Sequence, residues 1–293
     1  MHRQLWNVMK LDFKVKPRSP LLVKSGTEPL DPSLPDMYFV RTATSQGEAI
    51  YIPGSSLKGV FRSFTEKILR TISKSASCDP LSSSCGKRLE KEEDAVKIYG
   101  ESCYVCKMYG NTKLKGRIRF SDAYPEGGVK TEVRYGVAIS RLTQGVAQGP
   151  FEMETVVEGS FKGSLTLENF EAWQVGMIAL VIRALNDGVL RVGYGKNRGF
   201  GEVEFSVGNV MFRLAKKEKM PEDEVWGVGC YVEDDGYKVT LGKDDKISGL
   251  PKPDKVVDAV VFEERLYSPT SWENIAEKSM ETLRAFSERI TRK

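Results

Sequence analysis

Residues 49–62 combine a strand, a chain break and the start of an amphipathic helix, which limits the folds open to this chain. The apolar stretch 49–52 ends at Pro53-Gly54, a pair that interrupts a strand. Beyond this pair, apolar residues recur at helical spacing: Leu57, Val60, Phe61, Phe64, Ile68 and Ile72. We therefore expect a helix over residues 55–73, capped at its start by the hydroxyl of Ser55 or Ser56.

The start of this expected helix also carries two cations. Lys58 and Arg62 are four residues apart and therefore share one face of the helix. Free backbone N–H groups, two hydroxyls and two cations favour the binding of a phosphate group. The alternative is a capped helix whose charged side chains are simply solvated.

The remaining pattern indicates an α+β chain. Further strands are expected at 5–15, 117–121, 131–141, 153–167, 189–192 and 202–207, and further helices at 168–187 and from the capping box 270–273 onward. Because strands and helices do not alternate regularly, we expect helices packed on one face of an antiparallel sheet. Two insertions interrupt this pattern: a cysteine-bearing segment at about 75–106, and a hairpin at about 130–160 with a small, polar tip at 142–150.

Charge is distributed unevenly along the chain. Residues 222–264 hold twelve acidic residues against five lysines, a local balance of −7, although the whole chain carries +4. This asymmetry is typical of a polyanion-binding body with an acidic appendage. We therefore expect a core at 1–210 and an acidic C-terminal extension at 211–293, with a hairpin near Asp235-Gly236 and a terminal helix.

Composition disfavours several functional classes. The only histidine is His2, so serine–histidine, cysteine–histidine and histidine-based ribonuclease chemistry are disfavoured. No apolar run approaches the roughly 18 residues of a membrane span, and no signal-peptide core is present. The odd number of cysteines, five, argues against a disulfide framework. We expect a cytoplasmic protein with no membrane partner.

Four cysteines within 29 residues predict a metal site: Cys78, Cys85, Cys103 and Cys106. Four thiolates in a reducing compartment match a tetrahedral structural zinc site. Such an ion would hold the insertion at 75–106 together. With four protein ligands, it would have no free coordination position for catalysis. Free or redox-active thiols are the alternative.

A basic stretch follows the cysteines. Residues 107–120 contain no acidic residue and five cations: Lys107, Lys113, Lys115, Arg117 and Arg119. Arg117 and Arg119 are two apart on an expected strand, so they are expected on one face. This composition suits contacts along a nucleic-acid backbone, and a charge-protected strand edge is the alternative.

A glycine-rich turn and a proline-rich loop complete the candidate sites. The turn 193–201 has the wrong glycine spacing for a dinucleotide fingerprint, but Lys196 and Arg198 at its tip suit phosphates; the alternative is a tight hairpin without a ligand. In the loop 17–48, Asp36 and Asp31 are the plausible catalytic carboxylates, since an aspartate can position a divalent cation. Aspartates beside proline also form ordinary turns.

In this order, the segments resemble the RAMP superfamily of CRISPR-associated proteins, and more narrowly the repeated backbone subunit of type III effector complexes. The matching segments are 52–59 with Arg62, 116–123, 141–147 with 154–159, and 193–201. The resemblance implies a modified ferredoxin-like (RRM-like) core with lid, helical and thumb insertions.

The resemblance also implies a role in RNA binding. Subunits of this family stack along a guide RNA, so the partners would be guide RNA, target RNA, copies of the subunit or paralogues, and other effector subunits. The expected contacts to RNA are Ser55, Ser56, Lys58, Arg62, Lys113, Lys115, Arg117, Arg119, Lys196 and Arg198, together with Arg134, Arg141, Thr143 and Gln144 of a thumb that inserts between bases.

The family subunit carries a catalytic aspartate before its Pro-Gly-Ser-Ser motif, and Asp36 occupies that place here, with Asp31 as the alternative. The resemblance thus implies cleavage of target RNA with Mg²⁺ or Mn²⁺. Two further hypotheses stay open: an architectural RNA-binding subunit without nuclease activity, and a guide-processing endonuclease, which the lack of histidine disfavours.

Overall fold

The alternation at the N-terminus produces the central strand of the sheet. The computed structural model describes residues 4–26, 34–45, 47–217, 220–232 and 237–292. Strand β1 (Asn7–Pro17) buries Met9, Leu11, Phe13 and Val15 on one face and exposes lysines on the other. The expected strand at 5–15 is therefore confirmed.

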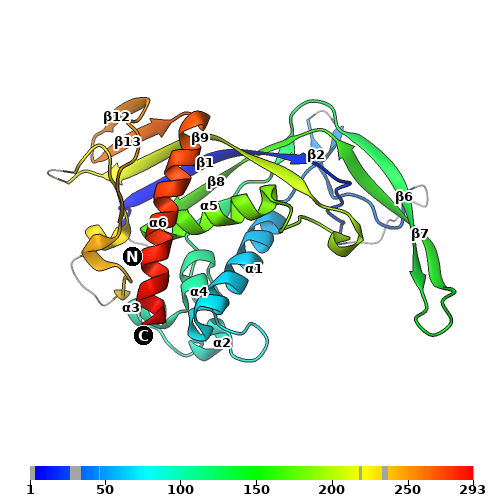
Figure 1. The fold of residues 1–293 in the computed structure, drawn as a ribbon, viewed down its shortest axis with the longest axis horizontal. Coiled ribbons are helices and arrows are strands. Elements are labelled where there is room, and N and C mark those ends of the chain that lie inside the picture. The colour runs from blue at the N-terminus through cyan, green and yellow to red at the C-terminus, as the bar shows by residue number, and fades with distance from the viewer. Residues whose placement is uncertain (1–3, 27–33, 46, 218–219, 233–236, 293) are drawn as a thin grey trace.

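Strand β1 lies inside a seven-stranded sheet (Figure 1). The order is β12–β13–β9–β1–β8–β4, and β5 also pairs with β8. The strands beside β1 are Val203–Ala215 (β9) and Phe161–Glu168 (β8), and the outer ones are Lys255–Ala259 (β12), Phe262–Tyr267 (β13), Ile118–Phe120 (β4) and Tyr124–Pro125 (β5). Every pairing in this sheet is antiparallel.

Three long helices lie along one face of the sheet: α1 (Gly54–Ile72), α5 (Ala172–Asn186) and α6 (Trp272–Thr291) (Figure 1). Trp173 of α5 stacks on Phe286 of α6 with ring centroids 4.2 Å apart. The predicted α+β architecture, with helices on one face of an antiparallel sheet, is confirmed.

Two insertions extend from this core. The cysteine-bearing insertion folds into three short helices, α2 (Cys85–Arg88), α3 (Ala95–Glu101) and α4 (Tyr104–Tyr109). The second insertion is a hairpin of β6 (Lys130–Ile139) and β7 (Val146–Glu158), which projects away from the body (Figure 1).

Two of the expected strands differ from the structure. The segment 153–167 is two strands, because Gly159, with φ +126°, ends β7 before β8 begins. The segment 189–192 is not a strand, although the Val192 N–H donates to the Gly201 carbonyl. The hairpin tip is also shorter than expected, since β7 already begins at Val146.

Helix starts were also predicted imperfectly. Helix α5 begins at Ala172 behind a capping box of Glu171 and Gln174. Helix α6 begins at Trp272 after a 3₁₀ turn, Pro269–Ser271, without a side-chain cap, so the expected capping box at 270–273 does not form. The long loop at 17–48 contains a small hairpin of β2 (Arg41–Thr44) and β3 (Gly47–Ile50).

The C-terminal extension continues the main sheet. Strand β9 runs through the expected boundary at residue 210, and β13 pairs along it from Phe262 to Tyr267. The extension also contains a small pair of strands, β10 (Val225–Trp226) and β11 (Lys246–Ile247). The hairpin expected at Asp235-Gly236 lies outside the described residues. In the part of the chain that the structure describes, no helix is long and apolar enough to cross a membrane.

Candidate nucleic-acid interface and metal centre

The start of α1 is built differently from the expectation. Pro53 occupies the N-cap position, and neither Ser55 nor Ser56 caps the helix. Instead, Oδ1 of Asp122 accepts a hydrogen bond of 2.8 Å from the Gly54 N–H. The predicted serine cap is therefore wrong, because a carboxylate from the neighbouring β-region already occupies the first helical N–H.

The exposed face of α1 forms a furrow in two parts. One hollow lies between α1 and the glycine-rich turn and is lined by Ser56, Gly59, Ser63, Lys67, Tyr194 and Lys196. The other lies against the loop after α4 and is lined by Ser55, Lys58, Gly59, Arg62, Asn111 and Lys115. Gly59 lines both hollows, which we call together the α1 furrow. Lys67 was not predicted, although the polar spacing 56–59–63–67 on a helix could have indicated it.

The lysines of the α1 furrow are electrostatically strained. Burial, followed by the nearby Arg62 charge, lowers the pKa of Lys58. Burial, followed by the charge of Lys67, lowers the pKa of Lys196. Lys67 and Lys196 are exposed and Lys58 is half-buried, so an anion bound between them would reduce the repulsion among these cations.

Glycines fix the shape of the turn at 193–201. Gly195 and Gly199 adopt φ +70° and +86° around the short helix η2 (Lys196–Arg198). A Cβ at Gly201 would lie 2.0 Å from the Val192 carbonyl oxygen, so only glycine fits this position. The turn therefore presents its two cations from a tightly packed backbone.

Aromatic contacts join this turn to the middle of the hairpin β6–β7. The Arg198 guanidinium lies 5.9 Å from the Phe151 ring centroid, and that of Arg134 lies 5.9 Å from the Phe200 ring centroid. Arg134 also forms an ion pair with Glu132. The structure thus brings Lys196 and Arg198 between the α1 furrow and the hairpin.

The tip of the hairpin exposes the three residues expected to act as a thumb. Arg141, Thr143 and Gln144 are all exposed, and Gln144 adopts φ 56°. The Thr143 N–H donates to the Ser140 hydroxyl, which closes the turn. The side chain of Leu142 is 94% exposed, so the tip offers an apolar as well as a polar surface.

The basic stretch after the cysteines does not act as a single surface. Lys113 and Lys115 are exposed in the loop beside the α1 furrow. Arg119 forms a salt bridge of 2.6 Å with Glu168, and its cross-strand neighbours place it on the sheet face that the helices leave uncovered. The structure therefore does not bring Arg119 to the furrow.

Arg117 is a correction to the expected set of RNA contacts. Arg117 is only 1% exposed. Its guanidinium lies 4.5 Å from the Tyr99 ring centroid, and its Nη1 atom is 3.9 Å from Oε1 of Glu171. The strand begins only at Ile118, so Arg117 and Arg119 do not form the expected exposed pair. Arg117 has no access to an RNA phosphate.

Arg117 belongs to a buried polar network that anchors the acidic extension. The buried carboxylate of Glu171 accepts hydrogen bonds from the Tyr99 hydroxyl and the Thr240 N–H. Asp245, also fully buried, accepts from the Ala172 and Gly229 N–H groups. Burial and then the nearby Glu171 charge raise the pKa of Asp245 to about 8.

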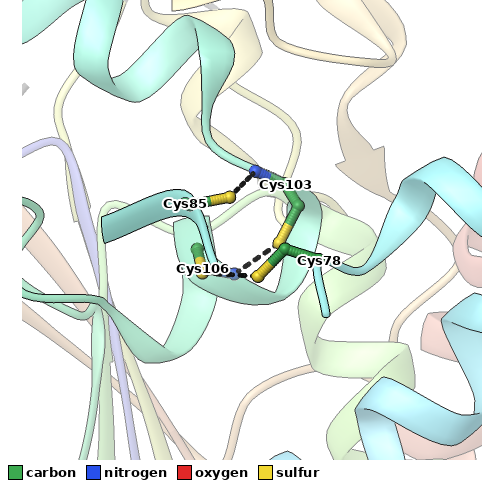
Figure 2. A group of neighbouring side chains, drawn as sticks. All are labelled: Cys78, Cys85, Cys103 and Cys106. Atoms are coloured by element: carbon green, nitrogen blue, oxygen red, sulfur yellow. Dashed lines mark hydrogen bonds between the residues drawn. The ribbon is translucent and has the colours of Figure 1, made fainter. Parts of the chain in front are cut away.

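The four predicted cysteines converge in one cluster (Figure 2). Their Sγ atoms lie within 4.8 Å of one another, and those of Cys78 and Cys106 are 3.7 Å apart. Four sulfurs at about 2.3 Å from a tetrahedral zinc ion are about 3.8 Å apart, so the cluster fits such an ion. The Cys103 N–H donates to Cys85 Sγ, and hydrogen bonds from the Cys103 and Cys106 side chains lower the pKa of Cys85.

Arg62 connects this cluster to α1. Its Nε donates to Glu66, Nη1 donates to the Gly110 carbonyl at 3.1 Å, and Nη2 lies 3.9 Å from Cys106 Sγ. Burial, the largest single effect, lowers the pKa of Arg62. The hydrogen bond to Glu66 and the nearby charges of Glu66, Cys106 and Cys78 together outweigh it, so the pKa is raised. Arg62 therefore lines the furrow and also contacts the cysteine cluster.

Asp36 lies beside the middle of the hairpin β6–β7. It is exposed, and its Oδ2 accepts a hydrogen bond of 2.9 Å from the Glu152 N–H of β7. Asp31 lies outside the described residues. Within the described residues the four cysteines are the only group of three or more metal-ligating side chains, so a cation at Asp36 would take its other ligands from RNA and water.

Comparison with known proteins identifies the family. A sequence model of the RAMP superfamily matches residues 14–204, about two thirds of the chain. This match covers the α1 furrow, the cysteine cluster, the hairpin and the glycine-rich turn, and it leaves out the acidic extension. No curated protein matches the chain. The chain belongs to the RAMP superfamily, whose members are CRISPR-associated proteins with an RNA-binding role.

Proposed function

We propose that the chain is a guide-RNA-binding backbone subunit of a type III CRISPR effector complex, which stacks with copies of itself or with paralogues and other subunits. The α1 furrow carries this proposal. Lys58, Lys67 and Lys196 line it from two segments, and in the described part of the chain none of them forms a salt bridge. Cations without carboxylate partners favour a polyanionic ligand.

The furrow suits an RNA backbone better than base edges. A Cβ at Gly59 would meet no atom within 4 Å, so this glycine leaves room on the exposed helix face for a close approach. The lysines supply charge without the planar geometry that reads bases. Guide sequence would then be read by base pairing with the target, while the protein holds the phosphates.

RNA binding by a pair of charge-reversed variants tests this proposal. We expect Lys58→Glu/Lys196→Glu to lower the affinity for a guide-length RNA about tenfold or more and to reduce the salt slope by about two. The control, Lys87→Glu/Lys255→Glu, changes the charge equally at exposed positions outside the furrow. Equal losses in the two variants, measured by fluorescence anisotropy, would refute the furrow as the binding surface.

We also propose that Asp36 serves cleavage of the target RNA. The supporting observation is its exposed carboxylate beside the middle of the hairpin, held by the Glu152 N–H. A Mg²⁺ or Mn²⁺ ion bound there would supply charge stabilisation at the scissile phosphate. The protein's own part is to hold this carboxylate beside the hairpin that would separate the paired segments.

A cleavage assay on guide–target duplex separates the open hypotheses. We expect Asp36→Asn to bind RNA normally and to lose metal-dependent cleavage, while Asp244→Asn, an exposed control in the extension, cleaves normally. Cleavage that persists in Asp36→Asn would move the role to Asp31 or to another subunit. If the unaltered chain yields no chelator-sensitive product in its complex, it is an architectural subunit. Cutting of a repeat hairpin in place of the paired target would indicate guide processing.

A further inference from the structure

A second basic hollow lies at the C-terminal end of α1, beyond the furrow. It encloses about 1020 Å³ between the last turns of α1 and α6, the cysteine-bearing insertion and the segment 238–240. Figure 1 shows these ends of α1 and α6 close to α2 and α3. Lys67, the last furrow residue on α1, precedes Arg70 of the second hollow by three residues, so the two hollows follow one another along the helix without sharing a lining residue. We call this hollow the α6 pocket.

The lining of the α6 pocket is mainly basic. Among the described residues, its acidic lining residues are Asp79 and Glu101, whereas its cations come from five separate segments: Arg70, Lys74, Arg88, Lys107, Lys238 and Arg289. None of these six forms a salt bridge with a carboxylate within the described residues. Hydroxyl groups of Ser75, Ser77 and Ser83 complete the wall.

The metal cluster accounts for only two of these cations. A zinc ion with four thiolates carries a net charge of −2, which must be included in the balance. Arg88 Nη2 lies 3.7 Å from Cys85 Sγ, and Arg70 Nη2 donates to the Cys78 carbonyl at 3.0 Å, so these two side chains serve the cluster. Four cations of the described lining therefore remain, compared with two carboxylates, Asp79 and Glu101. These cations are Lys74, Lys107, Lys238 and Arg289.

One of the remaining cations is buried. Lys107 is 3% exposed, and its Nζ lies 4.8 Å from the Tyr99 ring centroid and 5.4 Å from that of Tyr104. Its hydrogen bond to the Lys238 carbonyl, at 3.4 Å, is long. Glu171 acts on the charge of Lys107, but Lys107 forms no direct salt bridge within the described residues, so an anion in the pocket would further offset its charge.

We propose that the α6 pocket binds a phosphate-bearing ligand. Lysine, arginine and serine hydroxyls together are typical partners of phosphate oxygens. The volume is large enough for a nucleotide. The phosphates could come from a free nucleotide or from an RNA segment, and the pocket recognises the same chemistry in both. This site is separate from the α1 furrow and does not depend on guide binding there.

Charge reversal on the two sides of the pocket tests the proposal in the zinc-loaded full chain. We expect inorganic tripolyphosphate and ATP, titrated calorimetrically, to bind the unaltered chain. Lys74→Glu/Arg289→Glu should weaken this binding about tenfold or more. The matched control is Lys87→Glu/Arg284→Glu, which makes the same charge change in the same insertion and on the same helix at exposed residues outside the pocket. Circular dichroism confirms that both variants fold.

The outcomes also separate the two phosphate sources. Loss of ATP and tripolyphosphate binding in the pocket variant alone supports a free nucleotide. If neither small anion binds, a loss of RNA affinity in the pocket variant alone supports an RNA segment. Equal losses in both double variants, or no loss for any probe, overturn the proposal. The furrow variant Lys58→Glu/Lys196→Glu should keep its affinity for ATP, so failure of one site leaves the other testable.

Discussion

Replacing Gly59 by alanine should make the protein more stable and its RNA binding weaker. Gly59 lies in the interior of α1, on its exposed face, and an added Cβ would meet no atom within 4 Å. Alanine therefore introduces no clash in the free protein and restricts the unfolded chain. An exposed glycine-to-alanine change inside a helix stabilises by about 1 kcal/mol, which raises Tm by about 2 °C in a chain of this size.

RNA binding should change in the opposite direction. If an RNA backbone approaches Gly59 closely, the new methyl group must displace it or force the helix to adjust. Overpacking of this kind costs about 1–3 kcal/mol, so the affinity should fall about fivefold or more. Urea unfolding measures the first effect, and fluorescence anisotropy with a guide-length RNA measures the second.

Gly176→Ala is the matched control for the stability measurement. A Cβ at Gly176 of α5 would lie 2.2 Å from the Ser279 carbonyl oxygen of α6, a backbone atom that cannot move aside easily. We expect this change to destabilise the protein by about 1–3 kcal/mol. A stabilised Gly59→Ala protein that binds RNA as tightly as the unaltered chain would refute the close approach at Gly59.

Two further predictions concern the metal cluster and the buried network. Cys103→Ser should lose about one zinc ion per chain, measured by mass spectrometry. It should also lower Tm and the affinity for RNA, because Arg62 of α1 contacts the cluster. A normal zinc content would contradict the assignment of the four cysteines as a zinc site. Asp245 has a pKa of about 8 in the folded chain against 3.8 ordinarily, so the folded state retains a proton that the unfolded state releases. Stability should therefore fall as pH rises from about 4 to 8, and Asp245→Asn should reduce this fall in urea titrations; an unchanged pH profile would contradict it.

The sequence predicted those parts of the fold that depend on local pattern. Alternation defined β1, helical spacing located α1, and four cysteines with suitable spacing indicated the cluster that the structure shows. Each of these signals is carried by residues close to one another in the chain. Element ends were less predictable, because contacts from distant residues decide them. At the start of α1, for example, Asp122 accepts a hydrogen bond from the Gly54 N–H, whereas a cap by Ser55 or Ser56 was expected.

Arg117 shows why charge alone could not define the site. On the sequence it belongs to an uninterrupted basic stretch, and nothing nearby in the chain distinguishes it from Arg119. Its environment is set by Tyr99 and by Glu171, which is more than fifty residues away, together with Asp245 beyond it. A buried cation requires such partners to be assembled from several segments, and sequence spacing carries no information about that assembly.

The same reasoning applies to the acidic extension, which the charge pattern predicts to be an appendage. Its excess of carboxylates suggested a solvated surface, yet Asp245 is buried and binds the N-terminal N–H group of α5. Strand β13 also extends the sheet beside β9. The extension supplies two strands of the sheet and the last residues of β9, so truncation before residue 211 would cut β9 short, remove the strand that pairs with it and remove the Asp245 contact to α5. The extension is therefore part of the structure that positions the family core, although the family match ends before it.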